Sequence, residues 1–115
     1  MNEQRSLAKC CGFDFSTERT PSLCGFFEYE EGFCQGFGFF IDIAFLYRFC
    51  RVFNVDKLSK VNGKSCWVTH SNDQIFLIEP LHKKDGIPLD VIKWQSWIMN
   101  QLKSPLTMDR ILNEF

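Results

Sequence analysis

The chain has 115 residues, of which 45% are hydrophobic and 23% are charged, so its composition is that of a globular protein and excludes a disordered polar chain. Its formal net charge of −1 differs from the strongly basic balance that is typical of nucleic-acid-binding domains. No apolar run approaches the ~20 residues of a membrane-spanning helix, and no apolar signal sequence follows the polar N-terminus. We therefore expect one cytoplasmic domain over residues 1–115, without a membrane segment.

Phenylalanine and cysteine are the conspicuous residue types, with 13 and six copies. One core of this size does not bury that many phenylalanine rings completely, so we expect some apolar surface to remain for a partner. Because a reducing compartment keeps thiols unpaired, we predict free cysteines rather than disulfides.

The first forty residues favour strands. Apolar and β-favouring residues predict one strand over Leu7–Phe15 and a second over Leu23–Glu30, with a loop between them that contains Pro21. The glycine-rich segment 32–40 is compatible with a loop, with an irregular strand, or with both.

A helix is predicted over 42–53, with Asp42 as its N-cap. Its expected buried stripe follows the helical period and consists of Ile43, Leu46, Cys50 and Phe53. Further apolar residues extend that face: Phe45, Phe49 and Val52. We therefore expect this helix to be the central core helix.

A hairpin and a second helix are expected in the remaining chain. Two apolar runs, 64–70 and 74–79, flank the turn residues Ser71–Asp73 and predict a β-hairpin, whose register stays open because both faces are apolar. A helix over 90–103 carries Trp97 beside its apolar stripe. The predicted fold class is α+β, with a small antiparallel sheet, the central core helix and a C-terminal helix packed on the sheet.

No residue pattern predicts a metal or catalytic site. The chain has no Cys-x-x-Cys pair, and on a strand Cys66 and His70 stand roughly 13 Å apart, too far to share a metal or to act as nucleophile and base. Gly36-x-Gly38 lacks the third glycine of the dinucleotide fingerprint, and turn geometry explains these glycines better. We expect no metal, no cofactor and no enzymatic activity, and a small enzyme of unknown reaction is the second alternative.

Charge is distributed unevenly along the chain and suggests a partner-binding region. Residues 1–42 hold three basic residues against seven acidic ones, and residues 43–115 hold ten basic residues against seven acidic ones. The acidic Glu28, Glu30 and Glu31 are the candidate partner-binding residues. Trp97 is a candidate aromatic anchor, because aromatic residues are enriched at binding hot spots, although a core position suits it as well.

The first alternative function is nucleic-acid binding through the basic segment 48–64. Five cationic side chains lie close together in this sequence and could contact phosphates: Arg48, Arg51, Lys57, Lys60 and Lys64.

Three segments carry a resemblance to known proteins: GKSCWVTHS over 63–71, IEPLHKKDG over 78–86 and WQSW over 94–97. Over roughly residues 30–100 the chain resembles small uncharacterised proteins of phages and prophages. The resemblance implies an inhibitor of host defence, such as an anti-CRISPR protein, that occupies a surface of a host protein complex. The expected function is therefore non-enzymatic binding to a macromolecule, with a host protein as the expected partner.

Overall fold

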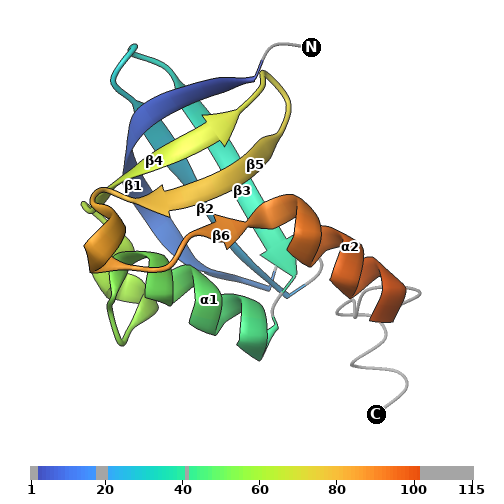
Figure 1. The fold of residues 1–115 in the computed structure, drawn as a ribbon. Helices are drawn as coiled ribbons and strands as arrows, with labels where there is room; N and C mark the ends of the chain where they lie inside the picture. Colours follow the sequence, from blue (N-terminus) through green and yellow to red (C-terminus); the bar gives the residue numbers. More distant parts are fainter. Residues whose placement is uncertain (1–2, 18–20, 41, 102–115) are drawn as a thin grey trace.

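Antiparallel strands form one curled sheet in the computed structural model, which describes residues 3–17, 21–40 and 42–101 (Figure 1). The described strands are β1 (Gln4–Ser16), β2 (Ser22–Tyr29), β3 (Cys34–Phe40), β4 (Ser65–His70), β5 (Ile75–Pro80) and β6 (Leu89–Asp90). The described helices are α1 (Ile43–Phe53) and α2 (Val91–Gln101), with the short 3-10 helices η1 (Leu58–Val61) and η2 (Lys83–Asp85).

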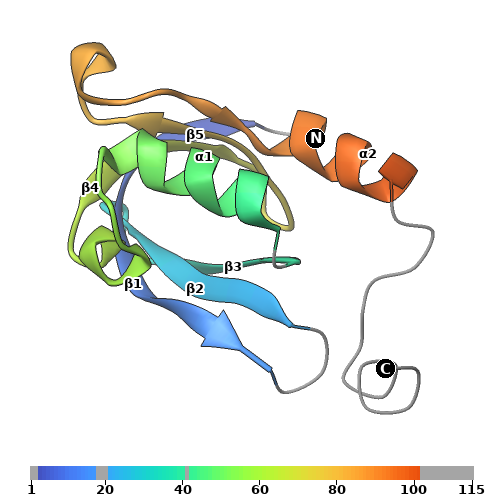
Figure 2. The ribbon, with the colours of Figure 1, turned by 90° about the horizontal axis from the view of Figure 1, so that it is seen from below.

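The sheet has six strands in the order β3-β2-β1-β4-β5-β6, and every pair is antiparallel. The α+β class is confirmed, but the expectation of a small sheet around a central helix is wrong. The sheet predominates and curls, so that Figure 2 shows α1 between β1–β3 on one side and β5 on the other. The sheet forms most of the fold, and α1 packs against its concave face through ring contacts with β1 and β3.

A bulge in the long strand β1 contributes to this curl. The register with β2 shifts between Cys11 and Asp14, where Gly12 has a φ of +64° that side chains rarely adopt. Asn62 stabilises the bulge from outside the sheet. Its Oδ1 accepts a hydrogen bond from the Phe13 backbone N–H at 2.7 Å, and its Nδ2 donates to the Phe13 carbonyl at 3.1 Å. The bulge therefore directs the Phe13 side chain into the concave face.

The concave face holds a cluster of aromatic rings. Phe13 lies 5.3 Å from Phe27 and 5.1 Å from Phe49, measured between ring centroids. Gly25 makes this packing possible, because a Cβ at that position would lie 2.5 Å from Cγ of Phe13. Among the described phenylalanines, six are buried in the core, whereas Phe15, Phe26 and Phe33 are exposed, as the expectation of remaining apolar surface requires.

The α1 helix has the predicted extent and cap, but its buried face is centred differently from the expected stripe. Of that stripe, Cys50 is buried, and Leu46 and Phe53 are partly buried against the core. The Asp42 side chain accepts a hydrogen bond from the Phe45 N–H at 3.0 Å, as expected of an N-cap. Ile43 is 78% exposed, although it was expected in the core. The fully buried residues of α1 are Phe45, Phe49 and Val52, whose centre lies about 100° around the helix from that of the expected stripe. The rings of Phe45 and Phe49 pack against Phe37 of β3, and these contacts orient the helix.

The β4–β5 hairpin is confirmed, and a bulge resolves the register that the sequence left open. Val68 faces Ile78, but the register shifts between Thr69 and His70, so that His70 faces Ile75. Ile75 and Ile78 are therefore both buried although they are three residues apart. No regular alternation of inward and outward side chains describes β5, because the bulge breaks the period of two.

The α2 helix follows β6 directly and packs its first turns on the core. The Asp90 side chain accepts a hydrogen bond from the Lys93 N–H at 3.0 Å and so caps the start of the helix. Val91 is fully buried, and Trp94 meets Phe45 edge to face at 6.3 Å. The last predicted helical positions, 102 and 103, lie outside the described residues.

Candidate functional site

The β3 strand is an outer strand of the sheet, and its hairpin with β2 determines which of its backbone groups remain unpaired. The Tyr29 N–H donates to the Phe33 carbonyl at 2.9 Å, and Gly32, with a φ of +103°, completes the three-residue turn. Hydrogen-bonded and non-hydrogen-bonded pairs alternate along an antiparallel ladder. Gln35 and Phe37 consequently bond to β2, whereas the N–H and C=O groups of the glycines between and after them point away from it.

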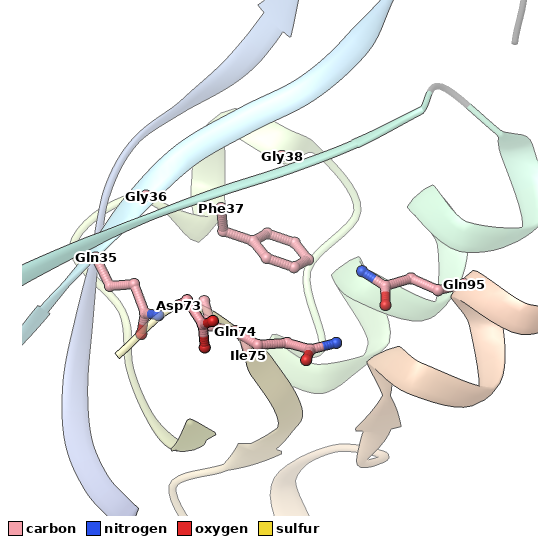
Figure 3. Close-up of a pocket in the computed structure, with 8 residues that line it drawn as sticks. All are labelled: Gln35, Gly36, Phe37, Gly38, Asp73, Gln74, Ile75 and Gln95. Atoms are coloured by element: carbon pink, nitrogen blue, oxygen red, sulfur yellow. The ribbon is translucent and has the colours of Figure 1, made fainter. Parts of the chain in front are cut away.

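We call the outward-pointing backbone groups of Gly36 and Gly38 the free edge of β3. A small polar hollow lies beside this free edge. The hollow has a volume of about 150 Å³. It is lined by residues of β3, of the β4–β5 turn, of β5 and of α2: Gln35, Gly36, Phe37, Gly38, Asp73, Gln74, Ile75 and Gln95. Figure 3 shows the carboxamide of Gln95 extending from α2 toward Phe37 and Gln74, with Asp73 at the opposite side. We call the region between the outer strand β3 and the β4–β5 turn the seam of the sheet. The hollow lies in this seam.

One hydrogen bond bridges this seam. Gln35 Nε2 donates to the Ser71 carbonyl at 3.0 Å, and Gln35 Oε1 accepts from the Tyr29 hydroxyl at 2.6 Å. The Tyr29 ring in turn stacks on His70 at a centroid distance of 4.1 Å. Burial raises the pKa of Tyr29 above its ordinary value, which keeps the hydroxyl protonated and able to donate. Both ends of the Gln35 carboxamide are thus fixed by hydrogen bonds. They hold β3 at a set distance from the β4–β5 turn.

A second set of hydrogen bonds connects the same histidine to the acidic turn. His70 Nε2 lies 3.0 Å from Ser6 Oγ, and Ser6 Oγ donates to Glu31 Oε2 at 3.0 Å. The residue types are those of a hydrolase triad, but the serine lies between the other two, and Ser6 and His70 are 1% and 3% exposed. A buried serine without access for substrate orders the strand ends and does not act as a nucleophile.

The three candidate acidic residues lie at the end of β2 and in the turn that follows it, and they differ in their contacts. Glu28 lies exposed on β2, opposite Lys9 of β1. Glu30 and Glu31 lie in the β2–β3 turn, where Gln4 Nε2 also donates to Glu31 at 3.1 Å. Glu31 is therefore held by the fold, while Glu28 and Glu30 present their charges to solvent.

The candidate basic residues include two arginines that bind main-chain carbonyls. Arg48 donates to the Pro88 carbonyl at 2.9 Å, and Arg51 donates to the Val55 carbonyl and to Asn54. Lys60 forms an ion pair with Asp56 at 2.8 Å, which lowers the pKa of that carboxyl group. The remaining two, Lys57 and Lys64, are exposed. Three of the five cations thus have partners within the fold.

Trp97 lies at the surface. It is 48% exposed and meets Trp94 edge to face at 5.4 Å. Its exposed part is compatible with the predicted role as an aromatic anchor, and its contact with Trp94 fixes the ring on α2.

The cysteines of the concave face are poor nucleophiles. Cys10 and Cys66 lie on the neighbouring strands β1 and β4 and are fully buried. Hydrogen bonding with Cys66, together with burial, raises the pKa of the Cys10 thiol, and burial raises that of Cys50. Since the thiolate is the reactive form, these positions give no catalytic centre.

The described residues, 3–17, 21–40 and 42–101, contain neither a metal-binding cluster nor a membrane-spanning helix. No group of three or more His, Cys, Asp or Glu side chains is arranged there to hold a metal ion. Neither described α-helix is long and apolar enough to cross a membrane. Comparisons with protein-family models, with curated proteins and with solved structures found no match.

Sequence reasoning missed the residues that line the hollow. It assigned Gly36 and Gly38 to turn geometry and gave no role to Asp73, Gln74 or Gln95. One signal was available, because glycine and phenylalanine alternate with a period of two over 36–39, as expected for a strand with one buried face. Asp73 and Gln74 belong to the β4–β5 turn and Gln95 belongs to α2, and the fold brings these two segments to β3.

Proposed function

We propose that the protein is a non-enzymatic binding module that takes an extended segment of a partner protein along the free edge of β3. The observation that carries this proposal is the hollow of about 150 Å³ that borders the backbone of Gly36 and Gly38. An unpaired strand edge presents N–H and C=O groups that an incoming strand can pair with. Side chains of the segment would then occupy the adjoining hollow, which adds selectivity to the main-chain pairing.

The glycines favour close approach of a second backbone. A Cβ added to Gly36 would meet no heavy atom within 4 Å, so the outer surface at this residue is open. At the other end of the seam the bond from Gln35 to the Ser71 carbonyl leaves no room for a strand. The proposed segment is therefore short and pairs with the portion of β3 that begins at Gly36.

The expected partner of the protein is a host protein, as the resemblance to phage and prophage proteins implies. Both the resemblance and the partner stay predictions. The exposed charges of Glu28 and Glu30 would then steer a basic partner surface and chiefly affect its association rate. The alternative through the basic segment 48–64 has less support, because Arg48 and Arg51 already bind main-chain carbonyls.

A displayed library of random linear peptides tests the proposal with a matched pair of variants. Gly36→Pro removes the outward N–H and places a ring at the free edge, and the β2–β3 ladder does not use that N–H. Gly36→Ala keeps the N–H and adds one methyl group in open space. Gly38→Pro repeats the first change at the next outward position.

We expect the wild type and Gly36→Ala to enrich the same peptides and both proline variants to lose them, with thermal unfolding confirming that all four proteins fold. Enriched peptides that bind the proline variants equally well would contradict the proposal, as would a library that yields none. A single-stranded DNA oligonucleotide serves as the competing probe, and binding of it that responds to Arg48→Ala but not to the proline variants would support the nucleic-acid alternative instead.

A further inference from the structure

The charge of the hollow indicates which side chain it accepts. Of its eight lining residues Asp73 alone carries a formal charge, and the others are glutamines, glycines and apolar residues. Ser71 Oγ donates to Asp73 Oδ1 at 2.9 Å, which orients the carboxylate and leaves its second oxygen available. The lining thus presents a single negative charge with no cation beside it, and it would repel a phosphate or a carboxylate.

Its uncharged groups are also suited to a hydrogen-bond donor. One N–H of the Gln35 amide nitrogen donates to the Ser71 carbonyl, and the amide oxygen accepts from the Tyr29 hydroxyl. Gln74 and Gln95 are half-buried, and their carboxamides can turn an oxygen toward a ligand. Acceptor oxygens from the turn and from α2 are therefore available to a donor, and Asp73 supplies the only formal charge among the lining residues.

The size of the hollow limits the donor to a compact group. A cavity of about 150 Å³ in protein interiors is large enough for benzene, so a planar guanidinium group fits the same volume. A guanidinium carries five N–H donors in one plane and reaches several acceptors at once, whereas an ammonium is a point charge. The apolar part of such a side chain would lie against Phe37, a buried ring at the hollow.

We propose that the hollow is an arginine-recognition pocket, in which Asp73 pairs with the guanidinium of an arginine in the partner's extended segment. This inference rests on the proposed function and deepens it by naming the residue that the seam selects. It predicts that Asp73 contributes to ligand selection while it leaves the stability of the fold nearly unchanged, because its side chain is exposed and bonds only to Ser71 among the described contacts.

The test is an NMR titration of isotope-labelled protein with acetyl-Gly-Arg-Gly-amide, using the same peptide with citrulline as the neutral isostere of arginine. The variant is Asp73→Asn, and Asp85→Asn in η2 is the matched control, since both aspartates are exposed and Asp85 does not line the hollow. The readouts are the backbone resonances of Gly36 and Gly38 and the side-chain amide resonances of Gln74 and Gln95.

We expect the arginine peptide to shift these resonances and to bind about tenfold more weakly after Asp73→Asn or after replacement of arginine by citrulline, because one charge-assisted hydrogen bond is lost. Asp85→Asn should leave the affinity unchanged. Equal binding of both peptides, no effect of Asp73→Asn, or no shift of the four residues would each overturn the inference. The proposed function fails separately, through the library selection with the proline variants, so the two failures are distinguishable.

Discussion

The concave face of the sheet and the seam at its edge are two regions built by different means. In the concave face, rings from β1, β2, β3 and α1 are packed by shape, and Phe27 and Phe49 are fully buried. At the seam, the Gln35 carboxamide bonds to the β4–β5 turn through one hydrogen bond and to Tyr29 of β2 through another, and a polar hollow lies beside it. Apolar packing closes one region completely, whereas the other remains partly open.

This difference assigns stability to one region and binding to the other. Burial of apolar rings stabilises in proportion to the area removed from water, so the concave face supplies most of the folding free energy. The seam contributes little by comparison, and its unpaired backbone and carboxamides remain available to a ligand. Substitutions should separate the two regions by the size of their effect on unfolding.

The largest loss of stability should follow Phe49→Ala. The ring is fully buried and contacts Phe13 and Phe53, so its removal leaves a cavity and should lower the free energy of unfolding by about 3–5 kcal/mol. Ile43→Ala on the same helix is the control, and at 78% exposure it should cost less than about 0.5 kcal/mol. Equal losses in urea unfolding would show that α1 is rotated differently from this account.

The second largest loss of stability should follow Gly25→Ala. The added Cβ would lie 2.8 Å from the Phe13 Cα, so either the ring or the backbone of β1 must shift, at about 1–3 kcal/mol. Gly36→Ala, in the neighbouring strand, adds the same group where no atom lies within 4 Å and should be nearly neutral. Thermal unfolding of the pair measures how closely the two strands pack, and a neutral Gly25→Ala would contradict the packing of Phe13.

A smaller loss should follow Gln35→Ala at the seam. The Tyr29 hydroxyl loses its acceptor and the seam loses its bridge, which should cost about 1–2 kcal/mol. Gln95→Ala, at the same hollow, serves as the control and should be close to neutral. If both variants unfold at the same urea concentration as the wild type, the bridge does not hold the seam.

The smallest effect is a dependence on pH. The pKa of Tyr29 is raised in the folded protein, so the protonated hydroxyl stabilises the fold. This stabilisation is fully present below the unfolded pKa of about 10 and is lost as the pH rises above that value. Tyr29→Phe cannot ionise, so the stability difference between wild type and variant should narrow from pH 10 upward. A constant difference over that range, measured by urea unfolding, would contradict burial of the hydroxyl.

Much of the fold follows from local pattern, and the candidate site does not. The Asp42 cap, the α1 helix and the β4–β5 hairpin rest on neighbouring residues, and the sequence predicts all of them. Rotation of α1 depends on Phe13 and Phe37, which are distant in the chain, so the local stripe beginning at Ile43 misleads. Helical period alone does not decide among several adjacent apolar faces.

The bulges explain the remaining differences. A positive φ at Gly12 and the register shift beside His70 change which residues face inward, and neither has a strong signature in the sequence. The hollow depends on both, because the curl of the sheet brings β3 to the β4–β5 turn. Acidic residues near Glu28 were identifiable by charge, whereas a site built from glycine backbone and glutamine side chains offers no such signal.

Amide hydrogen exchange along β3, measured residue by residue by NMR, tests the central claim most directly. The account predicts slow exchange at Gln35 and Phe37, whose N–H groups bond to β2, and fast exchange at Gly36 and Gly38, whose N–H groups form the free edge. A peptide enriched from the library should then slow exchange at the two glycines and leave Gln35 and Phe37 unchanged. Protection of Gly36 and Gly38 in the protein alone, or fast exchange at Gln35 and Phe37, would contradict it.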